Sequence, residues 1–579
     1  MGKTTIKSKS STILTTFLVC SITMFATSFL MSSNRVARHF YLNHAGYCSV
    51  VPDDPYYGTS WHLSRIEAEK AWEITTGRQN VFLAILDSGI NNISPYQSTD
   101  LSPNIDSINS LDLSYDYNGT PLFDYLSYHP NGCHGTRVAS IIGSKGNNSV
   151  DSAGICWNVN MLSIKCSGYS SGIDFGDIST IFNVNSQNYR GYVPIMNMSL
   201  GLTKRNSEYN QSDTDALYQA INSYNGLIVV SAGNGGKDLD NPNTNQNDLF
   251  YPAVFDCDNI IVVGSSSQNN EGKCSNSNYG STSVDLFAPG ENINSHKYHG
   301  DENGNIYYDG ICGFDGTSAA APQVAATAAL IKSVNPNYST GQIKAAILNN
   351  VDYLSSLNGL CVSGGRLNVY KAVKSAIPVY SSLNSVMSCV QSLDPDEHQF
   401  YKVNLTPGTY LFETTGSLDL YGSLFTDIQN NPVAIDADFF GNCSFTYTTN
   451  ISRTVYFKVQ NLSLTSGSYG IKISETLGHI HSYNDSYIWI NANQHRAYCS
   501  CLSSVLQPHT VTPSNPHYCI LCGGYADLGG IGPLSTYEEV GNDSRLTPNG
   551  VVILGNIDYE LISSGELTIE QLLLGGSIL

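Results

Sequence analysis

Four short apolar runs limit most strongly what this chain can fold into. The runs lack polar alternation and comprise residues 81–86, 195–199, 227–231 and 260–264. Strands that are buried on both faces have this composition, whereas half-exposed strands alternate apolar and polar side chains. Helix-like stretches, such as residues 214–223 and 318–333, alternate with the runs. The pattern predicts an α/β domain with a parallel sheet over residues 55–377.

The pattern of apolar and polar residues changes after this first domain. Residues 378–475 contain short strand-like segments separated by turn residues, which predicts a β-sandwich module. Residues 476–525 form a small segment that is rich in Cys and His, and residues 526–579 form a weakly patterned C-terminal tail.

The N-terminus has the features of an export signal. Three lysines, Lys3, Lys7 and Lys9, precede an apolar run over residues 12–31. Residues 1–33 therefore read as a cleaved signal peptide or as a signal anchor that spans the membrane. The protein is expected to be secreted and extracellular, or anchored at the cell surface by membrane attachment. Residues 34–54 would be a short pre-segment before the first domain.

Charge and cysteine content restrict the partners and the compartment. The net charge of −20 disfavours binding to nucleic acid, because the phosphate backbone would be repelled. Fifteen cysteines in an exported chain make disulfides chemically accessible, but the sequence does not define their pairing.

Two short motifs place an acid and a base near the apolar runs. Asp87 follows the first run, at the strand end where parallel sheets gather ligands and catalytic groups. His134 opens a stretch of small residues that is typical of a helix start, where an imidazole can serve as a general base. Taken alone, Asp87 reads as a turn residue after a strand, and His134 reads as a structural histidine.

Two further motifs supply a nucleophile and a polar donor. Ser318 precedes an Ala-rich helical stretch, so it is either a helix cap or a nucleophile at the positive end of the helix dipole. Asn234 follows the third apolar run, where its amide N–H could stabilise an oxyanion. A turn residue is the alternative for Asn234.

The four motifs together resemble those of the subtilisin-like serine peptidases, the subtilase family. The order Asp, His, Ser along the chain is that of this family and differs from the order in the chymotrypsin type and in the α/β-hydrolases. Residues 197–201, 285–290 and 364–368 resemble further landmarks of the family. The resemblance covers the chain from about Pro55 to Ala376 and implies a parallel-sheet subtilisin-like catalytic domain.

The resemblance implies a role for each motif residue. Ser318 would attack the scissile carbonyl, His134 would act as general base and Asp87 would orient it. Asn234 would complete the oxyanion hole. An extended polypeptide substrate would pair with Ser199, Leu200 and Gly201, while Ala232 and Gly233 would line the pocket for the side chain before the cut.

Departures from the family pattern are few in this region. Arg137 occupies a position that is often a histidine, and Cys133 directly precedes His134. No cofactor is expected for catalysis. Structural calcium is common in the family, and Asp100 is a weak candidate ligand; the alternative is a solvated loop carboxylate.

The C-terminal modules carry less specific signals. Residues 394–474 resemble the jelly-roll module that often follows the catalytic domain of secreted bacterial peptidases, a pre-peptidase C-terminal-like module. Two close cysteine pairs, Cys499 with Cys501 and Cys519 with Cys522, have a zinc-ribbon-like spacing, with two disulfides as the alternative.

The predicted function is that of a secreted serine endopeptidase acting through an acyl-enzyme intermediate. One alternative is a dedicated processing peptidase that matures an exported peptide. The other is an inactive surface adhesin or scaffold built on the same fold.

Overall fold

The computed structural model describes most of the chain between residues 50 and 519. The described residues are 50–91, 99–107, 110–112, 134–166, 193–204, 211–241, 249–300, 306–381, 383–436, 441–476, 486–491, 494–498, 504–508, 511–512 and 515–519. The predicted signal segment 1–33 and the C-terminal tail 526–579 lie outside them, as does most of the pre-segment 34–54. In the described part, no helix has the length and apolar composition needed to cross a bilayer.

The chain divides into two compact units. The first comprises Ala45–Pro407 and Leu411–Ser474, and the second comprises Met1–His44, Gly408–Tyr410 and Glu475–Leu579. In the second unit, the described strands beyond residue 485 form a three-stranded sheet and a hairpin. These strands are β23 (Ser486–Asn491), β24 (Gln494–Tyr498), β25 (Ser504–Pro508), β26 (Val511–Thr512) and β27 (Asn515–Cys519).

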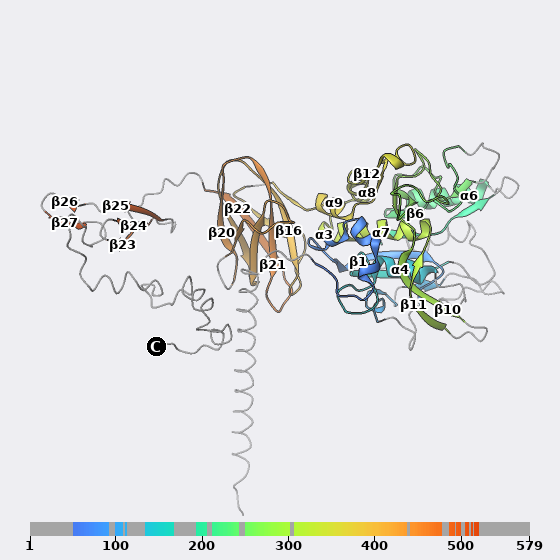
Figure 1. Cartoon of the computed structure of the whole chain (residues 1–579), viewed down its shortest axis with the longest axis horizontal. Helices are drawn as coiled ribbons and strands as arrows, with labels where there is room; N and C mark the ends of the chain where they lie inside the picture. The colour runs from blue at the N-terminus through green and yellow to red at the C-terminus, as the bar shows by residue number, and fades with distance from the viewer. Residues whose placement is uncertain are drawn as a thin grey trace, which may run out of the picture. The chain divides into compact units, whose positions relative to one another are not determined.

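A nine-stranded sheet forms the core of the part of the first unit that precedes residue 377 (Figure 1). In spatial order its strands are β12 (Asp352–Tyr353), β13 (Gly365–Arg366), β9 (Leu286–Pro289), β8 (Ile260–Ser266), β6 (Leu227–Ser231), β4 (Ile195–Met198), β1 (Gly77–Asp87), β3 (Asn158–Lys165) and β2 (Leu111–Asp112). Neighbouring strands pair in parallel, except that β12 is antiparallel to β13. The predicted parallel α/β sheet is therefore confirmed. The four apolar runs lie in β1, β4, β6 and β8, except for Ser199, which follows β4.

The helices pack against this sheet and against each other. They are α2 (Trp61–Arg65), α3 (Ala68–Trp72), α4 (His134–Gly143), α6 (Gln211–Ser223), α7 (Thr317–Val334), α8 (Thr340–Leu348) and α9 (Val369–Ser375). Helix α7 contacts β1, β4, β6, β8 and β9, so it crosses the middle of the sheet. Every residue of α7 except Lys332 is buried. Its many alanines allow this close approach, because they add little volume between the helix axis and the strands.

Helix starts have local causes in the sequence. Helix α8 begins with a capping box, in which Ser339 Oγ accepts from the Gln342 N–H and Gln342 Oε1 accepts from the Ser339 N–H. Helix α9 begins at Asn368, whose side chain accepts from the Lys371 N–H. Such caps satisfy backbone donors that have no partner inside the helix.

Two hairpin-like strand pairs lie beside the main sheet. Strands β10 (Ile293–Gly300) and β11 (Ile306–Phe314) pair antiparallel, and β10 packs against α4. Strands β5 (Leu202–Lys204) and β7 (Leu249–Tyr251) also pair antiparallel, with Thr203 opposite Phe250. Strand β5 follows β4 directly, so this pair extends from the carboxyl end of a central strand.

Residues 379–475 form a strand module with two sheets. The five-stranded sheet has the order β14 (Val379–Tyr380), β16 (His398–Leu405), β21 (Arg453–Asn461), β18 (Leu420–Phe425) and β19 (Ala434–Ile435). The four-stranded sheet has the order β15 (Val386–Ser388), β22 (Tyr469–Glu475), β17 (Gly408–Gly416) and β20 (Ser444–Thr449). Most of the pairings are antiparallel, as the sequence predicted, whereas β14 pairs with β16 in parallel. The jelly-roll assignment stays a prediction.

Candidate active site

Asp87 lies at the carboxyl end of a central strand. It is the last residue of β1 and is 4% exposed. Its Oδ1 accepts a hydrogen bond from the Ser88 N–H at 2.7 Å and lies 2.8 Å from Nδ1 of His134. The other carboxylate oxygen lies 3.0 Å from the same ring nitrogen. A carboxylate in this position holds the proton on Nδ1 and leaves Nε2 of His134 as the basic nitrogen.

His134 is the first described residue of α4. A β-carbon built at Gly135 would overlap the carbonyl oxygen of Gly89, so a glycine is needed for the helix to start this close to β1. The Ser88 Oγ accepts a hydrogen bond from the Gly135 N–H at 3.0 Å. The imidazole side chain is 36% exposed and meets Phe314 edge-on. One ring nitrogen therefore faces a buried carboxylate while the ring keeps access to solvent.

Opposing effects set the pKa of His134. Burial disfavours the imidazolium and lowers the pKa, whereas the charge of Asp87 and its hydrogen bond raise the pKa. The charge of Arg137 lowers it again. The net pKa of His134 is raised above 6.5. Because a base must be neutral to accept a proton, the raised pKa moves the working range of His134 to higher pH.

Ser318 lies in the first turn of α7, where it does not act as a cap. The N-cap position is Gly316, which has no side chain to cap the helix, and Ser318 lies two residues beyond it. Ser318 Oγ instead donates a hydrogen bond to the carbonyl oxygen of Ser199 at 3.0 Å. In return, Ser199 Oγ donates to the carbonyl oxygen of Ser318 at 3.1 Å. The capping alternative for Ser318 is therefore wrong.

Pro322 explains the second of these hydrogen bonds. Proline has no N–H, so the Ser318 carbonyl lacks the donor that a regular helix would supply four residues later. The Ser199 hydroxyl takes the place of that donor. The sequence motif contained Pro322, but its role depends on a contact with a segment more than a hundred residues away.

Asn234 is held against the start of α7 by its amide oxygen. Asn234 Oδ1 accepts from the Thr317 N–H at 2.9 Å and from Thr317 Oγ1 at 3.1 Å. A β-carbon on Gly316 would lie 3.0 Å from both polar atoms of this amide. Asn234 itself is exposed, and none of the described residues accepts a hydrogen bond from its Nδ2. The amide N–H groups are therefore available to an acceptor that enters from solvent.

Thr317 is a functional residue that the sequence reasoning missed. Its Oγ1 accepts a hydrogen bond from the Gly233 N–H at 3.1 Å while it donates to Asn234. The sequence did contain a signal for this residue, because Thr317 places a second hydroxyl group directly before Ser318. One side chain thus fixes both the segment after β6 and the predicted oxyanion donor.

The two predicted substrate segments flank Ser318. Residues 199–201 contact the first turn of α7 through Ser199, and residues 232–234 contact it through Gly233 and Asn234. Ser199, Ala232 and Gly233 are buried, whereas Leu200 and Gly201 are half-buried. The structure therefore brings the predicted catalytic and substrate-binding residues to one end of the sheet.

A second Asp–His–Ser group lies elsewhere in the domain and has a different geometry. Nε2 of His296 lies 3.0 Å from Asp100 Oδ2 and 3.1 Å from Ser144 Oγ. His296 and Asp100 are both fully buried. A catalytic relay needs the carboxylate and the serine on opposite ring nitrogens, but here both contact the same nitrogen. No substrate reaches a fully buried pair, so this group has a structural role.

The position of Asp100 argues against both predictions for it. Asp100 is not a solvated loop carboxylate, because it is 0% exposed. Asn148 Nδ2 donates to its Oδ1 at 3.0 Å, and His296 faces its Oδ2. Asp100, Asp151 and His296 each place one ligand atom within 4.8 Å of the others. Calcium prefers a shell of oxygen ligands, so a carboxylate already occupied by an amide and an imidazole does not fit that ion.

Arg137 connects α4 to the β10–β11 hairpin. Its Nε donates to Ser295 Oγ at 2.9 Å, and its Nη2 donates to the carbonyl oxygen of Cys312 at 3.2 Å. The guanidinium carbon lies 4.5 Å from the ring centroid of Phe314, the ring that also contacts His134. This residue, which departs from the family pattern, therefore has a defined structural function beside the predicted base.

Several of the described cysteines are free thiols. They are Cys156, Cys257, Cys274, Cys312, Cys361, Cys389 and Cys443. Cys133, Cys499, Cys501 and Cys522 lie outside the described residues. Cys519 ends β27, and its side chain is not described. The choice between zinc and disulfides in that segment therefore stays open.

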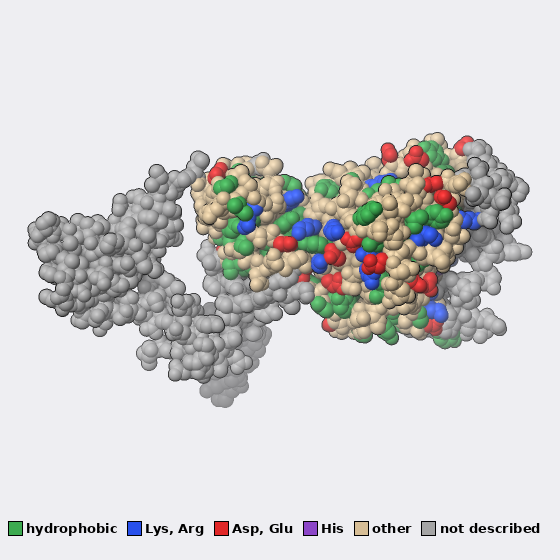
Figure 2. Space-filling view, turned by 45° about the horizontal axis from the view of Figure 1, so that its top comes forward, with side chains coloured by type: hydrophobic (Ala, Val, Ile, Leu, Met, Phe, Trp, Pro, Cys, Tyr) green, Lys and Arg blue, Asp and Glu red, His purple; other side chains and the backbone are tan. Residues whose placement is uncertain are grey.

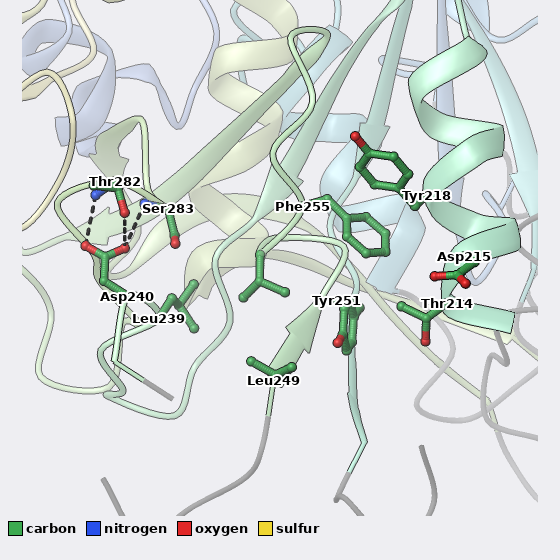
Figure 3. A pocket seen from close by; sticks show the side chains of 11 residues that line it. Thr214, Asp215, Tyr218, Leu239, Asp240, Leu249, Tyr251, Phe255, Thr282 and Ser283 are labelled. Carbon is green, nitrogen blue, oxygen red and sulfur yellow. Dashed lines mark hydrogen bonds between the residues drawn. The ribbon is translucent and has the colours of Figure 1, made fainter. Parts of the chain in front are cut away.

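A cavity of about 460 Å³ lies between α6 and β7 (Figure 3). Leu249 and Tyr251 of β7 line it, together with Tyr218 and Phe255, whose rings meet edge-on at 5.5 Å. Asp240 borders it and accepts hydrogen bonds from Thr282 and Ser283. None of the predicted catalytic or substrate-binding residues lines this cavity.

Comparison with known proteins defines the class. The Peptidase_S8 model, which describes the subtilase family, matches residues 78–371, about half of the chain. The chain belongs to the subtilase family of subtilisin-like serine endopeptidases. All residues predicted to be catalytic or substrate-binding lie within this match.

Individual relatives match slightly more than half of the chain. An alkaline protease of Alkalihalobacillus alcalophilus is 29% identical over 301 residues, which are 52% of this chain and 66% of the relative. Subtilisin Savinase of Lederbergia lenta is 29% identical over 301 residues, 52% of this chain and 93% of the relative. A solved structure titled as proteases from Pseudoalteromonas arctica PAMC 21717 is 24% identical with a TM-score of 0.46, and the match covers 56% of this chain and 99% of that one.

Proposed function

We propose that the protein hydrolyses polypeptides at a site formed by Asp87, His134, Ser318 and Asn234. The observation that carries this proposal is the hydrogen bond between buried Asp87 and Nδ1 of half-exposed His134. It leaves the other ring nitrogen basic, and the side chain as a whole is partly exposed to solvent. The second Asp–His–Ser group offers neither feature.

The proposed reaction follows from this geometry. The Ser318 hydroxyl turns from the Ser199 carbonyl toward His134 Nε2, which takes its proton as Oγ attacks the scissile carbonyl carbon. The oxyanion that forms accepts hydrogen bonds from Asn234 Nδ2 and the Ser318 N–H. His134 then gives the proton to the leaving amine, and an ester remains on Ser318. Water, deprotonated by His134, attacks this ester and restores the free serine.

The proposed substrate is a polypeptide in extended conformation. The backbone at Ser199, Leu200 and Gly201 follows a central strand, so the substrate can add to it through main-chain hydrogen bonds. Nucleic acid is not a proposed partner. On the face shown in Figure 2, basic side chains lie among acidic ones and form no continuous basic area.

Export and the C-terminal features belong to the same proposal. Residues 1–33 are proposed to direct secretion or to anchor the protein at the cell surface. Residues 378–475 are proposed to be a jelly-roll module, and Cys499, Cys501, Cys519 and Cys522 to hold zinc or form two disulfides. No metal takes part in the proposed catalytic steps.

A fluorophosphonate probe tests the proposal directly. The folded protein should form an adduct on Ser318, mapped by mass spectrometry, and Ser318→Ala should abolish it. Ser144→Ala is the matched control, because it removes the serine of the buried second group and should leave labelling intact. A folded protein that stays unlabelled, or labelling that is lost with Ser144→Ala and kept with Ser318→Ala, would contradict the proposed function.

A further inference from the structure

Phe250 lies between the two segments that flank Ser318. A β-carbon built on Gly201 would overlap Cζ and Cε1 of the Phe250 ring. A β-carbon built on Gly233 would lie 2.9 Å from the same Cε1 atom and 3.0 Å from Cδ1. One edge of the ring therefore contacts both glycines at once. Any side chain larger than hydrogen at either position would displace it.

Strand β7 directs this ring toward the site. Phe250 is the middle residue of β7, between Leu249 and Tyr251. Alternate residues of a strand point to opposite faces. Leu249 and Tyr251 line the cavity of Figure 3, whereas Phe250 is not one of its lining residues and contacts the glycines instead. Pairing with β5, which follows residues 199–201, fixes the position of β7.

The space between the two glycines is where a substrate side chain has to go. Ser318 is hydrogen-bonded to Ser199 on one side, and Asn234 is bonded to the neighbouring Thr317 on the other. A residue whose carbonyl carbon lies at Ser318 Oγ, with its oxygen toward Asn234, projects its side chain between residues 199–201 and 232–234. The Phe250 ring already occupies the floor of that space.

We infer that Phe250 restricts cleavage to bonds that follow a small residue, glycine or alanine. This inference rests on the proposed function, because it concerns the side chain on the acyl side of the bond that Ser318 attacks. A leucine or phenylalanine at this position would have to displace a half-buried aromatic ring whose edge is packed against both Gly201 and Gly233. Displacing a packed ring costs free energy, because its neighbours must also shift.

The inference predicts a measurable preference in the unaltered protein. Peptides of the form succinyl-Ala-Ala-Pro-X-p-nitroanilide, with X as Gly, Ala, Leu or Phe, report kcat/KM by the release of p-nitroaniline. We expect alanine to exceed phenylalanine by about tenfold or more, the scale by which a pocket rejects excess volume. A preference for leucine or phenylalanine, with Ser318 still labelled by the fluorophosphonate, would overturn the inference and leave the proposed function standing.

A substitution at Phe250 tests whether its ring causes the preference for a small residue. Phe250→Ala should raise the kcat/KM ratio of the phenylalanine peptide to the alanine peptide by about 100-fold. Phe255→Ala is the matched control, because it removes the same ring five residues later from the wall of the cavity in Figure 3. It should leave the ratio unchanged.

Two further outcomes complete the test. If Phe250→Ala does not fold, Phe250→Val leaves a smaller opening and should shift the ratio in the same direction. An unchanged ratio in a folded, labelled Phe250 variant would overturn the inference. A folded unaltered protein that is neither labelled nor active on any of the four peptides would remove the proposed function and the inference with it.

Discussion

The charge balance around His134 is the residue-scale property on which the proposed chemistry depends. Asp87 raises the pKa of the imidazole, and the nearby Arg137 opposes this effect. A general base must be neutral to accept the serine proton, so activity should develop only as the pH rises past the pKa of His134. That pKa lies above the ordinary 6.5.

Replacing Arg137 should move this pKa in a definite direction. Arg137→Met removes a positive charge that disfavours the imidazolium, so the pKa of His134 should rise further. The acid limb of the kcat/KM profile should therefore shift to higher pH, measured with the alanine peptide after active-site titration. Lys371→Met removes an exposed charge on α9 and should leave the profile in place. A shift of the Arg137→Met profile to lower pH would contradict the charge balance described here.

At the element scale, β16 of the β16–β21 pair shows how one strand can bury apolar side chains on both of its faces. In β16, Phe400, Tyr401 and Val403 are all buried, so the strand has an apolar environment on either side. Phe400 belongs to the same core cluster as the buried residues of the catalytic domain. The Nε2 atom of His398 lies 3.0 Å from the carbonyl oxygen of Glu73. Lys458 of β21 lies opposite Phe400.

Lys458 should make the stability of this strand pair depend on pH. Burial lowers the pKa of Lys458 to about 8, and the negative charge of Glu73 opposes part of this effect. Between that value and the ordinary 10.5, the unfolded chain binds the proton and the folded chain does not, so this group makes the folded state more stable as pH rises.

A methionine at position 458 isolates this effect. Lys458→Met should be more stable than the unaltered protein below pH 8, by about 1–2 kcal/mol after allowance for solvent screening. The advantage should shrink as the pH approaches 10. Urea unfolding at a series of pH values gives the difference in unfolding free energy. An advantage that is independent of pH would show that Lys458 is not titrating in this range.

At the scale of the first unit, the strand module and the catalytic domain share one core. Phe400, Phe425 and Ile428 belong to the same buried cluster as Tyr370 and Ile377. The polar contacts include an ion pair between Arg78 and Glu397 at 2.6 Å and another between Lys374 and Asp427 at 3.2 Å. A tethered accessory module would not need to bury apolar side chains against its neighbour.

Truncation should reveal this dependence. A chain that ends at residue 377 exposes the surface that those three apolar side chains cover, at about 1.5–3 kcal/mol for each buried side chain. Its unfolding temperature should fall by roughly 5 °C or more. A chain that ends at residue 476 keeps the shared core and should unfold near the temperature of the full chain. Calorimetry of the three proteins measures this, and equal unfolding temperatures would show that the module adds no stability.

The sequence by itself predicted the parallel sheet, the later antiparallel strands and the residues of the candidate site. Buried strands have a local apolar signature, and short motifs at strand ends and helix starts keep their order along the chain. Asp87, His134, Ser318 and Asn234 could therefore be named before their distances were known. Their catalytic roles stay proposals until Ser318 is labelled.

Other features could only be decided by the tertiary structure. Nothing local distinguishes Asp100 as a fully buried residue, reveals that Thr317 bonds Asn234, or places Phe250 against Gly201 and Gly233. Each of these contacts joins segments that are tens to hundreds of residues apart, and its energy depends on distance and burial. A sequence records which groups a chain carries, whereas close packing determines which of them meet and which remain open to a substrate.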